Sequence, residues 1–116
     1  MKLSDANFKD GVIRQGASIG FGSPLGNVKD GVVRTGGTKG FGAALGNAKD
    51  GIIRDGGTRG FGNAIGNVKN GIVRNGSSLG FGSAIGDVKD FMIKGMEREK
   101  DEEIIASYHF LVKKIL

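Results

Sequence analysis

Residues 37–56 read GTKGFGAALGNAKDGIIRDG, and nearly the same twenty residues occur four times in a chain of 116. Full copies begin near Ile19, Lys39, Arg59 and Leu79, and a partial copy, NFKDGVIRQG, precedes them. A constant period without insertions is the signature of a repeat array. We therefore divide the chain into a glycine-rich repeat array, residues 1–95, and a charged segment with a C-terminal helix, residues 96–116.

The repeat fits a helical pattern. On a helix, Phe41, Leu45 and Ile52 fall within about 40° of one another, and Asp50 falls on the opposite side. Glycines occupy both flanks, where small residues allow neighbouring helix backbones to approach closely. This pattern predicts an all-α array of about five short, antiparallel, glycine-flanked amphipathic helices. Their expected N-caps and C-terminal glycines are Thr38, Thr58, Ser78, Gly56 and Gly76.

Two features of the repeat favour a different fold. Pairs of β-branched residues, such as Val32–Val33 and Ile52–Ile53, are typical of strands. Pro24 lies where the other copies have alanine, and a proline inside a helix would break it. Either the first helix begins at Ser23, or each GFG is a loop. The alternative prediction is a β-solenoid with 20-residue coils, with the glycines at its corners.

The last copy differs from the others because KDF replaces KDG at residues 89–91. Beyond a charged block, apolar residues recur at steps of three and four, which predicts an amphipathic helix that caps the array. They are Ile104, Ile105, Tyr108, Leu111, Val112, Ile115 and Leu116. His109 lies off this apolar stripe, and we expect it at the surface.

The composition offers little for catalysis or metal binding. The chain has no cysteine and one histidine, and its GFG segments lack the Lys-Ser/Thr of a phosphate-binding loop. We expect no enzymatic activity, cofactor, metal or small-molecule substrate. The charged N-terminal residues do not form a signal peptide, and no apolar run is long enough to span a membrane. We therefore expect an intracellular protein, soluble or peripheral on membranes.

The net charge is +5, and the array is its basic part. A basic polar side opposite an apolar stripe is typical of helices that lie on anionic lipid surfaces. We predict peripheral lipid binding through an apolar face of Phe21, Leu25, Phe41, Leu45, Phe61, Ile65, Phe81 and Ile85. The expected head-group contacts are Lys29, Arg34, Lys49, Arg54, Lys69 and Arg74. We do not expect nucleic-acid binding, because aspartates dilute the basic residues.

A structural role is the alternative prediction. Another copy of the chain could cover the same apolar face, which would make the protein a self-assembling subunit of a layer, oligomer or filament.

Units of the form GFGxAxG-x-x-K-x-G resemble the C-terminal amphipathic-helix repeats of chorein-type bridge lipid-transfer proteins. More loosely, they are similar to the repeated helices of perilipins. The resemblance covers residues 7–95 and implies helices that bind membranes or lipid droplets.

Overall fold

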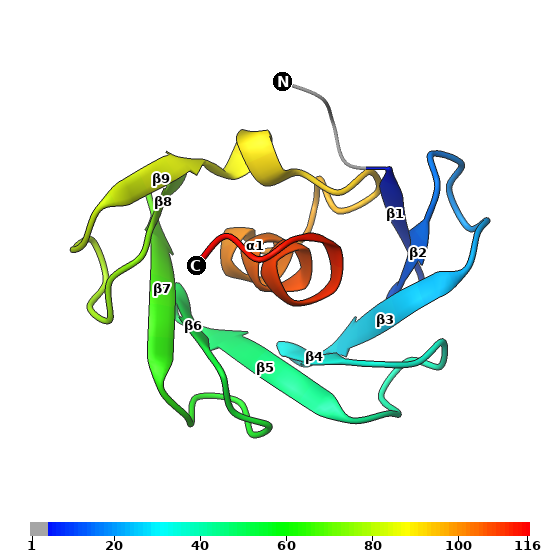
Figure 1. The fold of residues 1–116 in the computed structure, drawn as a ribbon, viewed down its shortest axis with the longest axis horizontal. Coiled ribbons are helices and arrows are strands. Elements are labelled where there is room, and N and C mark those ends of the chain that lie inside the picture. The colour runs from blue at the N-terminus through cyan, green and yellow to red at the C-terminus, as the bar shows by residue number, and fades with distance from the viewer. Residues whose placement is uncertain (1–4) are drawn as a thin grey trace.

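The structure, a computed structural model, describes residues 5–116 as one antiparallel sheet wound around a helix (Figure 1). Nine strands pair in chain order. They are β1 (Ala6–Lys9), β2 (Val12–Gln15), β3 (Pro24–Lys29), β4 (Val32–Arg34), β5 (Ala44–Lys49), β6 (Ile52–Arg54), β7 (Ala64–Lys69), β8 (Ile72–Arg74) and β9 (Ala84–Asp87). A 3₁₀-helix, η1 (Val88–Phe91), then leads to α1 (Asp101–Ser107) and a π-helical turn, η2 (Tyr108–Val112). The predicted all-α array of amphipathic helices is therefore wrong.

The KDG segments, and the KNG segment at residues 69–71, make hairpin turns. Lys49 pairs with Ile52, which leaves Asp50 and Gly51 as a two-residue loop with φ of 52° and 81°. Two positive φ values in succession are the mark of a type I′ turn, for which Asp-Gly is a preferred sequence. The other three hairpins have the same backbone at their turns. The helical prediction placed this turn in the middle of a helix.

The side chains follow the two-residue period of a strand. Ile53 is completely buried, whereas Phe41, one of the residues of the predicted helical stripe, is 70% exposed. The predicted helix caps are also wrong: the carbonyl of Thr38 accepts a hydrogen bond from Phe41 N in a loop. Pro24 is the first residue of β3, a position that tolerates proline. The β alternative was closer, although the strands form antiparallel hairpins and not solenoid coils.

The sheet curls into a ring, which the segment around Lys94 closes against β1. Asn7 in β1 forms a parallel bridge with Lys94, and Phe8 N donates to the Lys94 carbonyl at 2.7 Å. The Lys94 Nζ also donates to the Ala17 carbonyl at 2.9 Å. A fifth hairpin does not form, because Phe91 stands where the earlier turns have a glycine at positive φ. The segment after η1 closes the ring instead (Figure 1).

The interior of the barrel is filled by α1 (Figure 1). Four β-branched residues at equivalent positions of the short strands point inward and are completely buried, as are Ile104 and Ile105 of the helix. The four are Ile13, Val33, Ile53 and Val73. The C-terminal helix was predicted to cap the array; the structure places it inside the array, where both parts share one core. The division into domains 1–95 and 96–116 stays a prediction.

Glycines in the long strands make room for the C-terminal residues. A Cβ added at Gly46 would collide with the ring of Phe110. At Gly26 and Gly66 an added Cβ would lie 2.5 Å from a methyl group of Leu111 and Leu116, respectively. The repeated glycine of the ALG and AIG segments therefore allows the C-terminal residues to pack against the strands. The helical prediction assigned it to packing between neighbouring helices.

Candidate binding surfaces

Four loops between hairpins carry the exposed phenylalanines, and we call them the Phe loops: residues 16–23, 35–43, 55–63 and 75–83. A buried asparagine holds each loop against the outer side of the preceding hairpin. The Asn47 Nδ2 donates to the carbonyls of Gly56 and Phe61 at 2.8 and 3.0 Å. Its Oδ1 accepts from Gly60 N at 2.8 Å. Asn7, Asn27 and Asn67 make the corresponding bonds, and all four asparagines are fully buried.

Further contacts of the repeat fix the tip of each loop. The guanidinium of Arg54 donates to the Gly62 carbonyl at 3.0 Å, and the side chain of Lys49 lies over Gly60. Gly60 and Gly62, on either side of Phe61, both have positive φ. The GFG sequence therefore forms a sharp turn that only flanking glycines adopt without strain.

The ring of the phenylalanine has no evident role in the loop fold. Phe61 contributes its backbone: its carbonyl accepts from Asn47, and its N–H donates to the Thr58 carbonyl at 2.9 Å. Any residue except proline supplies these two groups. The four phenylalanine side chains are 68–72% exposed, and among the loop residues other than glycine they alone are identical in all four copies. The position that precedes GFG, in contrast, holds Ile19, Lys39, Arg59 or Leu79.

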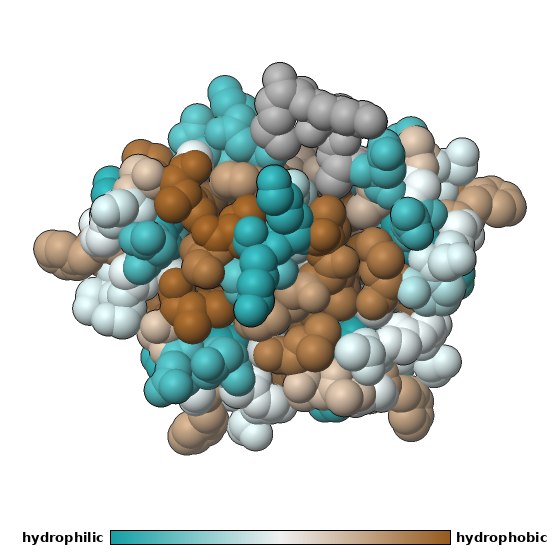
Figure 2. All heavy atoms as spheres, viewed as in Figure 1, coloured by the Kyte–Doolittle hydropathy of each residue, from teal (hydrophilic) through white to brown (hydrophobic). Residues whose placement is uncertain are grey.

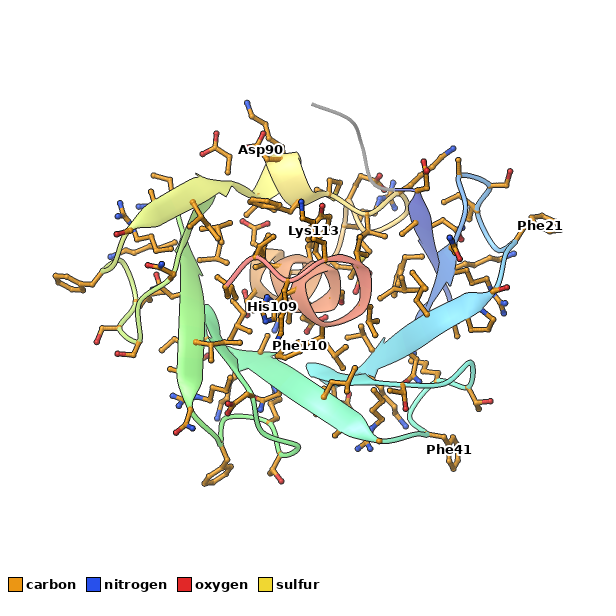
Figure 3. The ribbon with its side chains drawn as sticks, viewed as in Figure 1. Phe21, Phe41, Asp90, His109, Phe110 and Lys113 are labelled. Carbon is orange, nitrogen blue, oxygen red and sulfur yellow. The ribbon has the colours of Figure 1, made fainter. Side chains whose placement is uncertain are left out.

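The Phe loops lie at intervals around the rim of the barrel (Figure 1). Phe21 and Phe41 point away from the centre in clearly different directions (Figure 3). The predicted lipid face is therefore not one surface. Its four phenylalanines are exposed at the rim, whereas its four aliphatic residues are half-buried: Leu25, Leu45, Ile65 and Ile85. Leu25, Ile65 and Ile85 pack against the barrel core.

The predicted head-group residues also fall into two kinds. The lysines of the set are exposed at the hairpins, and they are Lys29, Lys49 and Lys69. The arginines are partly buried, and each donates to the carbonyl of the glycine that follows a loop phenylalanine. These arginines are Arg34, Arg54 and Arg74. Their guanidinium groups thus have a structural task that the sequence analysis missed.

A second candidate surface lies at the end of the barrel where the chain leaves η2. We call it the C-terminal face, and it consists of residues 110–116 with Leu25. Its apolar residues are half-buried, whereas Lys113 and Lys114 are exposed. In Figure 2 hydrophobic atoms surround a hydrophilic strip at the centre of this end, where the C-terminal segment crosses the ring in Figure 1. The helical spacing of the apolar residues in this segment predicts a stripe that docks over the array, whereas in the structure these residues are packed against the barrel core.

His109 holds the C-terminal segment in place. Its Nδ1 accepts two hydrogen bonds, from Ile115 N and Leu116 N, each at 3.0 Å. The side chain is buried, so the predicted surface position is wrong. Burial, and secondarily the charge of Lys114, lowers the pKa of His109 below its usual value. The neutral imidazole is the form that accepts both bonds.

A hollow of about 390 Å³ is lined mainly by charged residues that include Asp10, Lys39, Glu99 and Glu103. Burial, and then the neighbouring charge of Glu99, raises the pKa of Glu103. Within residues 5–116 no three histidine, cysteine or carboxylate side chains gather as a metal site would require. The same residues contain no helix with the length and hydropathy to cross a membrane. No family model, curated protein or solved structure matches the chain.

Proposed function

We propose that this chain is a non-enzymatic structural repeat protein that assembles with copies of itself through its Phe loops. The observation that supports the proposal is the phenylalanine at each loop tip. It is the same in four loops whose other side chains differ, it is largely exposed, and its ring is not needed for the fold of the loop. An unchanged exposed aromatic residue on variable loops is typical of a contact with a partner.

The arrangement of the loops favours contacts with several neighbours. Because the tips point outward in different directions around the rim, a single flat surface meets only some of them (Figure 3). Neighbouring copies that approach from the sides meet them all. Burying one phenylalanine ring at such a contact contributes about 1.5–3 kcal/mol, so several weak contacts together stabilise an assembly.

The first and fourth loops are the stronger candidates for contact. They carry Ile19 and Leu79 before the GFG, and these side chains are 38% and 39% exposed. The two middle loops carry Lys39 and Arg59 at this position, so pairing like loops brings equal charges together. The loop after β2 and the loop after β8 lie on opposite sides of the barrel (Figure 1). Two apolar tips on opposite sides favour a linear chain of copies.

Analytical ultracentrifugation over a wide range of protein concentrations tests this proposal. We expect the average mass of the wild-type protein to rise with concentration. Replacing Phe21 and Phe81 by serine should abolish this rise, and the matched pair Phe41→Ser/Phe61→Ser should weaken it less. Circular dichroism should be unchanged in both variants, since these rings lie outside the core. A wild-type protein that stays monomeric at every concentration would contradict self-assembly. Equal effects of the two variant pairs would contradict the stronger role of the first and fourth loops.

A further inference from the structure

The C-terminal face differs from the Phe loops in shape and charge. Its apolar side chains are Phe110, Leu111, Val112, Ile115 and Leu116, all half-buried. They lie at the end of the barrel seen in Figure 2, in a view down the shortest of the three molecular extents of 37, 32 and 21 Å. The face is thus on a broad side of a flattened molecule, whereas the Phe loops occupy the rim.

The relief of this face is shallow. A hollow of about 220 Å³ on it is lined by Leu25, Leu111 and Val112 and by Asp5, Ala6 and Gln15 of the first hairpin region. Sites that enclose small molecules are usually about 300–1,000 Å³ and surround most of the ligand. A broad and shallow apolar surface suits another extended surface better than it suits a small ligand.

The two lysines of the face distinguish between the surfaces that could cover it. Lys113 and Lys114 are consecutive and exposed in the middle of the apolar tail, and the whole chain carries +5. If two copies met through this face, the lysine pairs would approach one another and repel. An anionic lipid surface attracts them instead, and their long apolar stems allow the ammonium groups to reach head groups while neighbouring side chains enter the interface.

We infer that the C-terminal face docks on anionic lipid surfaces, with Lys113 and Lys114 at the head groups and the apolar residues of the tail at the acyl boundary. The Phe loops take no part in this contact, because they lie at the rim. In this orientation the barrel axis is perpendicular to the lipid surface, and the rim stays free for neighbouring copies. Lipid docking and self-assembly therefore use separate residues.

Flotation with vesicles tests the inference. The full chain should float with vesicles that contain phosphatidylserine, float poorly with pure phosphatidylcholine, and release at high salt. Lys113→Glu/Lys114→Glu should reduce the bound fraction at least about tenfold. Lys89→Glu/Lys100→Glu makes the same change in net charge at exposed residues outside the face, and it should reduce binding much less. Equal losses in the two variants would overturn the inference, as would a wild-type protein that ignores anionic vesicles at low salt.

A tryptophan reporter identifies the surface that enters the lipid, since the chain contains no tryptophan. The emission of Val112→Trp should shift to the blue when anionic vesicles are added. The emission of Phe41→Trp, at a rim loop, should stay unchanged under the same conditions. If Phe41→Trp shifts and Val112→Trp does not, the Phe loops are the lipid contact and the inference is wrong.

Discussion

Replacing Asn47 by aspartate exchanges one buried nitrogen for an oxygen and leaves the size of the side chain unchanged. The amide nitrogen donates to the carbonyls of Gly56 and Phe61 at 2.8 and 3.0 Å. A carboxylate has no proton to donate, so both carbonyls lose their hydrogen bond and face a negative charge. Each buried acceptor left without a partner costs about 1–3 kcal/mol. Because two acceptors are affected, we expect Asn47→Asp to lower the free energy of unfolding by about 3–5 kcal/mol at neutral pH.

Asn75→Asp provides the matched control. Asn75 is exposed and uses its Oδ1 to accept from Ser83 N at 3.2 Å. In the preceding copy Asp55 makes the same bond to Asn63 N at 3.0 Å, so the carboxylate fits this position. The same chemical change should therefore cost less than about 0.5 kcal/mol there.

Urea unfolding followed by circular dichroism measures both variants. Acidification should partly restore the stability of the Asn47→Asp variant, because the protonated carboxyl can donate a hydrogen bond to one of the two carbonyls. The pKa of the new carboxyl is raised in the folded state, so its penalty is largest above that pKa and shrinks as the pH falls through it. If Asn47→Asp and Asn75→Asp unfold at the same urea concentration at neutral pH, the buried asparagines do not hold the Phe loops.

Two further changes test the interior of the barrel. Gly46→Ala should destabilise the protein by about 1–3 kcal/mol in urea unfolding, because the new Cβ displaces the ring of Phe110 and lies 2.7 Å from the Arg54 carbonyl oxygen. Gly57→Ala, whose new Cβ meets only a methyl group at 3.2 Å, should cost clearly less. For His109 the folded-state pKa is lowered, so we expect its contribution to stability to be complete above about pH 6.5 and to fall as the pH decreases from there. The pKa of Glu103 is raised in the folded state, so this carboxyl contributes stability at low pH that is lost as the pH rises. The effect of His109 should therefore be measured in the Glu103→Gln background. If the urea midpoint of that variant is the same at neutral and mildly acidic pH, the role of His109 is contradicted.

The sequence contains signals for strands and turns, but the helical period of about 3.6 residues fitted its few apolar residues and led to the wrong prediction. Asp50-Gly51 between Lys49 and Ile52 is a hairpin signal, and the β-branched pair Ile52–Ile53 supports it. Phe41, Leu45 and Ile52 happen to share one side of a helix, and this coincidence outweighed the turn signal. The turn sequence was more informative here than the helical periodicity, because six of the twenty residues 37–56 are glycine and few large apolar side chains remain to define a period.

The role of Asn47 and the closure of the ring depend on contacts that a linear pattern does not display. Asn47 binds the carbonyl of Phe61, fourteen residues further on. The only available signal was its recurrence as Asn7, Asn27 and Asn67, with aspartate, Asp87, in the last copy. Closure joins Phe8 to Lys94 through backbone groups, which any residues supply. The apolar spacing predicted a C-terminal helix with a stripe that runs to Leu116, whereas the helical part of the structure ends at Val112. The place of this helix inside the barrel follows from the strand curvature.

Equivalent positions of the repeat meet different partners inside the barrel, and this difference limits the array. Gly26, Gly46 and Gly66 are equivalent in the repeat, yet they receive Leu111, Phe110 and Leu116. One tail thus contacts three copies at three different positions along itself. An open solenoid extends without limit because each copy meets only its neighbours. Here α1 also contacts β3, β5, β6 and β7, which belong to three successive copies, so the size of the helix limits how many copies the barrel holds. The outer side has no such limit, and the repeated phenylalanine remains available there to further chains.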